Sequence, residues 1–197
     1  MSNFKNRVKF LSLLLPAILI LTFCENKKQN SSDAELGATY NSDYRIEKKE
    51  EIVMVYITSP GCGICTLQEN IEVVKQIKSR LEKKADSLEL GFMTIGISNN
   101  WVIEKGYSHL EDYGSFDEVL IGNNWFGTGT MKYIFDEFAG TPAVPSLVLT
   151  KRVYGGSNND STFIARGVED EQLVRRMFGI DKLREWLDQG LPLPSDI

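Results

Sequence analysis

The chain has 197 residues, a formal net charge of −5 and an apolar share of 42%, which suits an ordinary folded domain. Its negative balance argues against a nucleic acid partner. With three cysteines and one histidine, the chain has few ligands for a zinc centre, and we predict no metal site.

Residues 1–23 are predicted to be a targeting segment. Three basic residues precede an apolar stretch, residues 10–23, that is short for a membrane span. The stretch ends directly before Cys24 and resembles a bacterial lipoprotein signal. That resemblance implies lipidation of Cys24 and a lipid-anchored protein of the bacterial cell envelope, outside the cytoplasm on the periplasmic side. An uncleaved anchor or an ordinary secretory signal is the alternative. Loss of the basic residues would move the net charge from −5 to −8; they are Lys5, Arg7 and Lys9.

The next segment, residues 24–45, is predicted to be a flexible tether because it is mostly polar and nearly lacks apolar residues. About twenty flexible residues have a root-mean-square reach of roughly 25 Å, so the domain would stay near its membrane. Residues 46–197 remain for folding, which is enough for one core.

A pair of cysteines follows the first predicted strand. The nearly continuous apolar run Ile52–Thr58 predicts a strand buried on both faces. Ser59-Pro60-Gly61 supplies a turn, Cys62-Gly63-Ile64-Cys65 comes next, and the amphipathic segment Thr66–Lys84 predicts a helix. The first N–H groups of that helix would favour a thiolate. This placement favours redox chemistry by the cysteine pair itself, with no other cofactor; half of a zinc site is the alternative.

The remaining pattern alternates between strands and helices. Such alternation, closed by a hairpin and a helix, implies an α/β fold with a central mixed β-sheet flanked by helices on both faces. The predicted elements are strands Leu88–Ser98 and Phe116–Ile121, helices Trp101–Tyr113 and around Met131–Phe138, a hairpin of Ser146–Tyr154 and Ser161–Arg166, and a closing helix from about Glu169 with a break or new cap at Gly179–Asp181.

This order of elements resembles the thioredoxin-like superfamily, over roughly residues 50–189. The resemblance implies that Pro145 is a cis proline facing the cysteine pair. Because a cis bond turns the preceding backbone outward, Val144 is expected to pair with an extended substrate strand. The predicted site therefore has catalytic Cys62 and Cys65 and substrate-binding Val144 and Pro145; a proline that only begins a strand is the alternative. Gly167, between the predicted last strand and last helix, also resembles the family pattern.

The segment from Asn99 to Thr141 is longer than in a minimal thioredoxin. An added helix and strand before the cis-proline strand resembles the membrane-tethered TlpA- and ResA-like thiol reductases. The resemblance implies an extracytoplasmic thiol-disulfide oxidoreductase that reduces protein disulfides and takes electrons from a membrane donor. Cys62 would attack as the exposed thiolate and Cys65 would resolve the mixed disulfide. The alternatives are a disulfide oxidase or isomerase, and a Cu(I) carrier with His109 as third ligand.

Several residues depart from the family pattern. Tyr56 stands where thioredoxin keeps a buried acid, and Glu69 is the candidate substitute in a proton relay, with solvated helix surface as the alternative. His109, beside Glu111 and Asp112, is expected at the surface. An aromatic cluster is expected to pack the added elements onto the sheet, with a partner groove as the alternative: Trp101, Tyr107, Tyr113, Trp125, Phe126 and Tyr133. The pattern indicates no oligomeric state.

Overall fold

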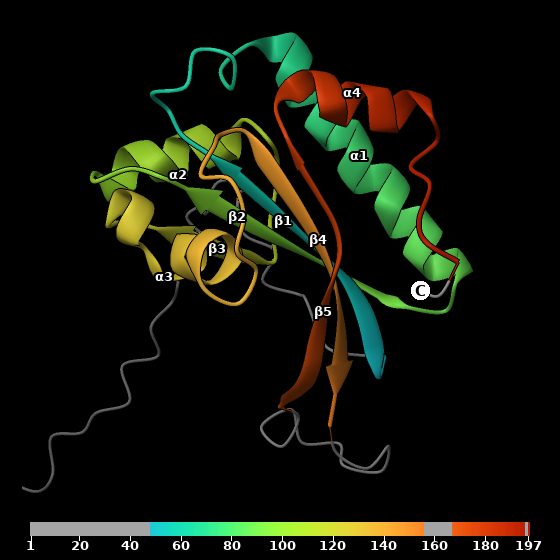
Figure 1. Ribbon diagram of the computed structural model, residues 1–197. Helices are drawn as coiled ribbons and strands as arrows, with labels where there is room; N and C mark the ends of the chain where they lie inside the picture. Colours follow the sequence, from blue (N-terminus) through green and yellow to red (C-terminus); the bar gives the residue numbers. More distant parts are fainter. Residues whose placement is uncertain (1–47, 156–166, 196) are drawn as a thin grey trace, which may run out of the picture. The chain divides into compact units, whose positions relative to one another are not determined.

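The computed structural model describes residues 48–155, 167–195 and 197. They form an α/β domain with a five-stranded mixed sheet flanked by helices, which confirms the predicted thioredoxin-like fold class (Figure 1). The predicted signal segment and tether lie outside the described residues. The principal elements are β1 (Glu50–Thr58), α1 (Gln68–Ser87), β2 (Gly91–Ser98), α2 (Ile103–Glu111), β3 (Glu118–Ile121), β4 (Ser146–Tyr154), β5 (Val168–Phe178) and α4 (Ile180–Asp188).

The sheet has the strand order β3-β2-β1-β4-β5. β1 pairs in parallel with β2, which pairs in parallel with β3, whereas β4 runs antiparallel to both β1 and β5. β1 is thus the central strand, and Glu51 to Thr58 are all buried. A strand covered on both faces needs no polar alternation, which is why its sequence is an almost unbroken apolar run.

Two cores cover the two faces of the sheet. On one face, Ile52, Met54 and Tyr56 of β1 pack with apolar residues of α1 and α4, which lie side by side (Figure 1). On the other face, Val53, Val55 and Ile57 pack against the segment that follows β3. The period of two along β1 therefore divides the domain into its layers.

The added segment between β2 and β4 contains α2, β3 and three short helical turns. The turns are η1 (Asn124–Phe126), α3 (Thr128–Thr130) and the π-helical η2 (Met131–Phe135). Gly129 allows the close approach of α3 to the sheet, since a Cβ there would lie 2.6 Å from the Leu120 side chain. The predicted added helix and strand are present. Within the described ranges, no helix is both long and apolar enough to cross a membrane.

The C-terminal part differs from the prediction. Residues 168–178 form the edge strand β5, so the helix predicted from Glu169 is wrong over these residues. The helix predicted after a break at Gly179–Asp181 is confirmed, since α4 begins at Ile180. The pairing register shifts where Leu149 faces Arg175 and Thr150 faces Leu173, so the ladder passes over Val174. This β-bulge breaks the strand's period of two, and the apolar spacing then imitates a helix.

The position of the glycine at the end of the sheet is corrected for the same reason. Gly167 directly precedes β5, so its placement between the last strand and the last helix was wrong. Gly179 holds that position, with a φ of 79° that favours glycine. The predicted hairpin strand Ser161–Arg166 lies outside the described residues.

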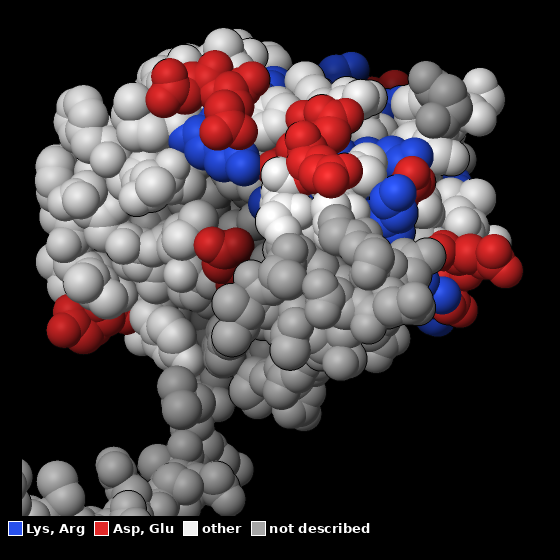
Figure 2. All heavy atoms as spheres, turned by 90° about the horizontal axis from the view of Figure 1, so that it is seen from below, with Lys and Arg blue, Asp and Glu red and all other residues white. Residues whose placement is uncertain are grey.

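Charged side chains of both signs are mixed on the face shown in Figure 2, where Lys and Arg stand beside groups of Asp and Glu. Ion pairs of the domain include Lys151 with Glu50 at 2.9 Å and Lys132 with Glu171 at 2.7 Å. This face shows no continuous basic area.

Candidate redox site

The two cysteines lie in consecutive turns between β1 and α1. The Cys62 N–H donates to the Ser59 carbonyl at 3.0 Å, and the Cys65 N–H donates to the Cys62 carbonyl at 2.9 Å. Helix α1 begins only at Gln68, so the cysteines do not occupy its first turn. The expectation that the helix opening stabilises a thiolate is therefore wrong in detail, because the turn itself supplies the nearest N–H group.

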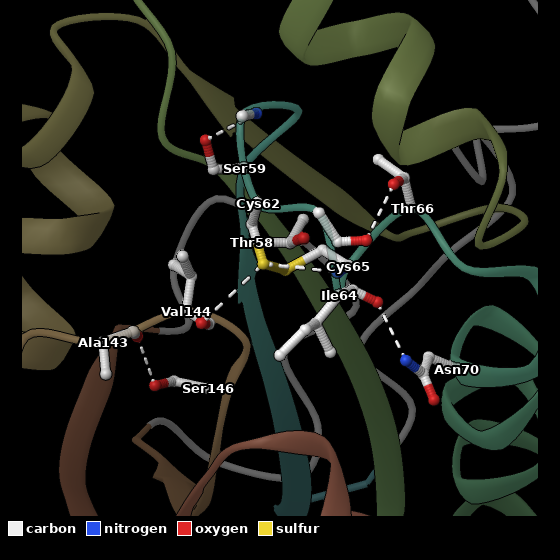
Figure 3. Close-up of a disulfide and its surroundings, with 12 residues drawn as sticks. Thr58, Ser59, Cys62, Ile64, Cys65, Thr66, Asn70, Ala143, Val144 and Ser146 are labelled. Carbon is white, nitrogen blue, oxygen red and sulfur yellow. Dashed lines mark hydrogen bonds between the residues drawn. A yellow bond between two sulfur atoms is a disulfide. The ribbon is translucent and has the colours of Figure 1, made fainter.

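The cysteines form a disulfide with an S–S distance of 2.14 Å and a Cα–Cα distance of 5.2 Å (Figure 3). Cys65 is 1% exposed, whereas Cys62 is half-buried. A reagent or substrate arriving from solvent can reach only the Cys62 sulfur. The two cysteines therefore differ in accessibility although their side chains are chemically identical.

The Cys62 sulfur lies between a donor and an acceptor. The Cys65 N–H is 3.2 Å from Cys62 Sγ, and the Val144 carbonyl oxygen is 3.8 Å from the same atom (Figure 3). A disulfide sulfur has no proton, so the second distance is a contact here. In the reduced protein a thiolate at Cys62 would accept from the Cys65 N–H, which favours the charged form.

The Val144–Pro145 loop faces the disulfide. The peptide bond between these residues is cis, and the Gly179 N–H donates to the Pro145 carbonyl at 2.9 Å. Ser146 Oγ donates to the Ala143 carbonyl at 2.6 Å, which closes the turn (Figure 3). Val144 is half-buried and Pro145 is buried. The structure therefore brings the two residues predicted to bind substrate together with the cysteine pair.

A buried polar cluster lies below Cys65. The Tyr113 hydroxyl donates to the Cys65 carbonyl, and the Tyr56 hydroxyl donates to that of Tyr113 at 3.3 Å. Burial raises the pKa of both tyrosines, so the hydroxyls stay protonated as donors. Tyr56 thus contributes a neutral hydroxyl to this cluster.

His109 belongs to the same cluster, so its predicted surface position is wrong. The residue is 5% exposed, and its Nε2 lies 2.9 Å from Thr58 Oγ1. Its ring packs edge-on against Tyr113, with centroids 5.5 Å apart. Burial lowers the pKa of His109 below its usual value. The acidic residues that follow His109 in the sequence suggested exposure, but His109 lies on the face of α2 that is turned toward the interior.

Glu69 and its neighbour Asn70 occupy very different surroundings. Glu69 is exposed in the first turn of α1, and its carboxylate lies 4.0 Å from Arg184. Asn70 is buried, donates to the Ile64 carbonyl at 2.9 Å and accepts from Arg184 at 3.0 Å. Asn70 thereby anchors the cysteine turn to α1, a role that the sequence analysis missed. Only its adjacency to the cysteines signals it.

An open groove borders Cys62 on the side of the added segment. Trp101 and Trp125 line it together with uncharged residues. Trp125 also packs against the core on this side of the sheet, as the sequence predicted. Trp101 is 63% exposed and Phe126 is 73% exposed, so for these two the packing prediction is wrong; for the buried Tyr113 and Tyr133 it is confirmed. The lining consists of Ser59, Gly61, Cys62, Asn99, Asn100, Trp101, Asn124, Trp125 and Val144.

The cysteines are not joined by further metal ligands. Among the described residues, no group of three or more His, Cys, Asp or Glu is placed to hold a metal ion. The ligand set Cys62, Cys65 and His109 of the copper alternative is therefore not assembled.

No protein-family model matches the chain, and no curated protein matches it. The fold and the disulfide define a thioredoxin-like α/β protein with a cysteine pair in a CxxC turn, an arrangement compatible with thiol redox chemistry.

Proposed function

We propose that this protein is a thiol-disulfide oxidoreductase that reduces protein disulfides through Cys62 and Cys65. One observation carries the proposal: the disulfide joins a half-buried Cys62 to a fully buried Cys65 beside the Val144 carbonyl. A structural disulfide needs no such asymmetry, whereas a two-step exchange needs one accessible and one protected sulfur.

In the first step, the Cys62 thiolate of the reduced protein attacks one sulfur of the substrate disulfide. A bond forms between Cys62 Sγ and that sulfur, and the substrate S–S bond breaks. The other substrate sulfur leaves as a thiolate and takes a proton from water. The Cys65 N–H, 3.2 Å from Cys62 Sγ, favours the attacking thiolate.

In the second step, the Cys65 thiol gives its proton to water, and the resulting thiolate attacks Cys62 Sγ. The disulfide between Cys62 and Cys65 forms, and the mixed disulfide breaks to release the second substrate thiolate. Two electrons have then passed from the protein to the substrate. A dithiol donor must restore the reduced pair, and we propose a membrane protein for this role.

The proposed location is the bacterial cell envelope, with a lipid on Cys24 that anchors the domain on the periplasmic side. Thiol exchange suits a compartment in which disulfides persist. Mass spectrometry of the protein isolated from bacterial membranes tests the anchor. Acylated Cys24 at the N-terminus is expected, and an unprocessed Met1 would contradict it.

Reduction of insulin by the purified domain, with dithiothreitol as reductant, tests the activity. The wild type should accelerate it, and Cys62→Ser should reduce the rate to background. Cys65→Ser should lose turnover but accumulate a mixed disulfide at Cys62. Full activity of Cys62→Ser would contradict the proposal. A reduction potential near −120 mV would favour oxidation, since related proteins extend from about −270 to −120 mV.

A further inference from the structure

The groove beside Cys62 is built from two kinds of side chain. The lining contains two indole rings, of Trp101 and Trp125, and three carboxamides, of Asn99, Asn100 and Asn124. Trp101 is 63% exposed, an unusual degree for a tryptophan, while the Trp125 ring is supported edge-on by Phe135 at 6.5 Å. No lining residue is charged, although the whole chain has a net charge of −5.

One of the carboxamides is incompletely paired. Asn99 is 3% exposed; its Oδ1 accepts from Thr130 Oγ1 at 2.7 Å, but its Nδ2 has no hydrogen-bond partner. A buried donor without an acceptor is destabilising. This Nδ2 atom is itself enclosed, so a peptide in the groove meets the half-buried Asn100 and Asn124 rather than Asn99.

The position of the groove determines what can enter it. Cys62 and Val144 are themselves part of the lining. On the proposed function, a substrate sulfur is bonded to Cys62 Sγ in the mixed disulfide, so the chain that flanks the substrate cysteine must leave across the adjoining surface. That occupant is a polypeptide, whose carbonyl and N–H groups match carboxamides.

We propose that this groove is a specificity site for an extended polypeptide with a large apolar or aromatic residue next to its reactive cysteine. The apolar side chain packs between Trp101 and Trp125. The neighbouring peptide groups pair with the carboxamides of Asn100 and Asn124. Aromatic rings are the common anchors of such contacts. Because the lining is uncharged, charged side chains at the same substrate position gain nothing there. The inference rests on the proposed function, which supplies the covalent link.

Turnover of three peptide disulfides by the wild type and by Trp101→Ala tests the inference. The peptides carry Phe, Ser or Lys beside the cysteine, and bis(2-hydroxyethyl) disulfide is the small substrate without a flanking chain. The wild type should have a kcat/KM about tenfold higher for the Phe peptide than for the others, and Trp101→Ala should remove this preference. Both proteins should reduce the small disulfide within twofold of each other. Phe126→Ala, which alters an exposed ring outside the groove lining, should behave as the wild type.

Binding of the same peptides, with Ser replacing the cysteine, is measured on the oxidised protein by calorimetry and requires no turnover. The Phe peptide should bind most tightly, and more weakly to Trp101→Ala. Equal affinity of the wild type for all three peptides would overturn the proposed specificity site. So would a loss of kcat/KM in Trp101→Ala that is as large for the small disulfide as for the Phe peptide. Failure of the proposed function has another signature, since no disulfide would then be reduced by the wild type while the binding order still tests the groove.

Discussion

The polar side chains at the two ends of β1 differ in charge and in exposure. At the end near Glu51, charged groups are buried and paired with one another. At the end after Thr58, a buried and uncharged polar cluster lies beside half-buried groups that border the groove, namely Cys62, Asn100 and Asn124. Buried and paired groups hold a fold, whereas half-exposed groups with unused bonding capacity can meet a substrate. The same strand therefore separates the part of the molecule that maintains the structure from the part that we propose to react.

At the end of β1 near Glu51, the buried charged groups surround Arg152. Its guanidinium lies 3.1 Å from Glu171 and 3.9 Å from Glu51, and it donates to the Tyr133 hydroxyl at 2.7 Å. Burial opposes ionisation of Glu171, yet the hydrogen bond from Lys132 and the charge of Arg152 hold its pKa below the usual value. The network connects β1, β4, β5 and the added segment.

The largest effect is expected from Arg152→Met. The two buried carboxylates lose the cation that they share, which costs about 3–5 kcal/mol of unfolding free energy. Urea unfolding measures this loss. The control Lys182→Met removes an exposed pair with Glu185 at 3.0 Å and should change stability by less than about 1 kcal/mol. If both variants cost the same, the contrast between the two ends is wrong.

A smaller effect is expected from Tyr113→Phe, which tests the boundary between the two ends. The Cys65 carbonyl loses its buried donor, so the unfolding free energy should fall by about 1–3 kcal/mol. The half-buried Cys62 should not respond, and its alkylation rate in the reduced variant should stay within twofold of the wild type. A large change in that rate would show that Tyr113 acts on the reactive sulfur as well.

The smallest effect is a pH dependence from His109. Its pKa is lowered in the folded state, so between the folded value and about 6.5 the unfolded chain binds more protons. Stability should fall as the pH falls through that interval, by at most about 1.4 kcal/mol per unit, and remain level above it. Urea unfolding from pH 5 to 8 should show this slope in the wild type and not in His109→Gln. Equal slopes would contradict a buried neutral imidazole.

Much of the fold followed from local patterns in the sequence. The unbroken apolar run of β1, the cysteine turn after it and the proline before β4 are each short, continuous signals, and the structure brings Cys62 Sγ within 3.8 Å of the Val144 carbonyl. Their catalytic and binding roles stay predictions. A regular strand can be recognised from its sequence pattern, whereas the bulge at Val174 gave the sequence of β5 the spacing of a helix.

The surroundings of the cysteines were less predictable, because they depend on contacts between distant elements. His109 faces Thr58 across 51 positions of sequence, and the charges beside it suggested exposure. Trp101 suggested a packed core residue, and its exposure follows from the loop before α2. Asn70 and Asn99 carry no pattern of their own. Only the folded chain assigns them, one as an anchor of the cysteine turn and one as a lining residue of the groove.

The difference between the two sulfur atoms is the central claim, and alkylation of the reduced protein measures it directly. Brief treatment with iodoacetamide from pH 5 to 9, followed by mass spectrometry of the peptides, reports each cysteine separately. Cys62 should be modified with a midpoint below the usual thiol pKa of about 8.5, while Cys65 stays protected. Equal modification of both cysteines, or a midpoint for Cys62 at or above that value, would contradict the account.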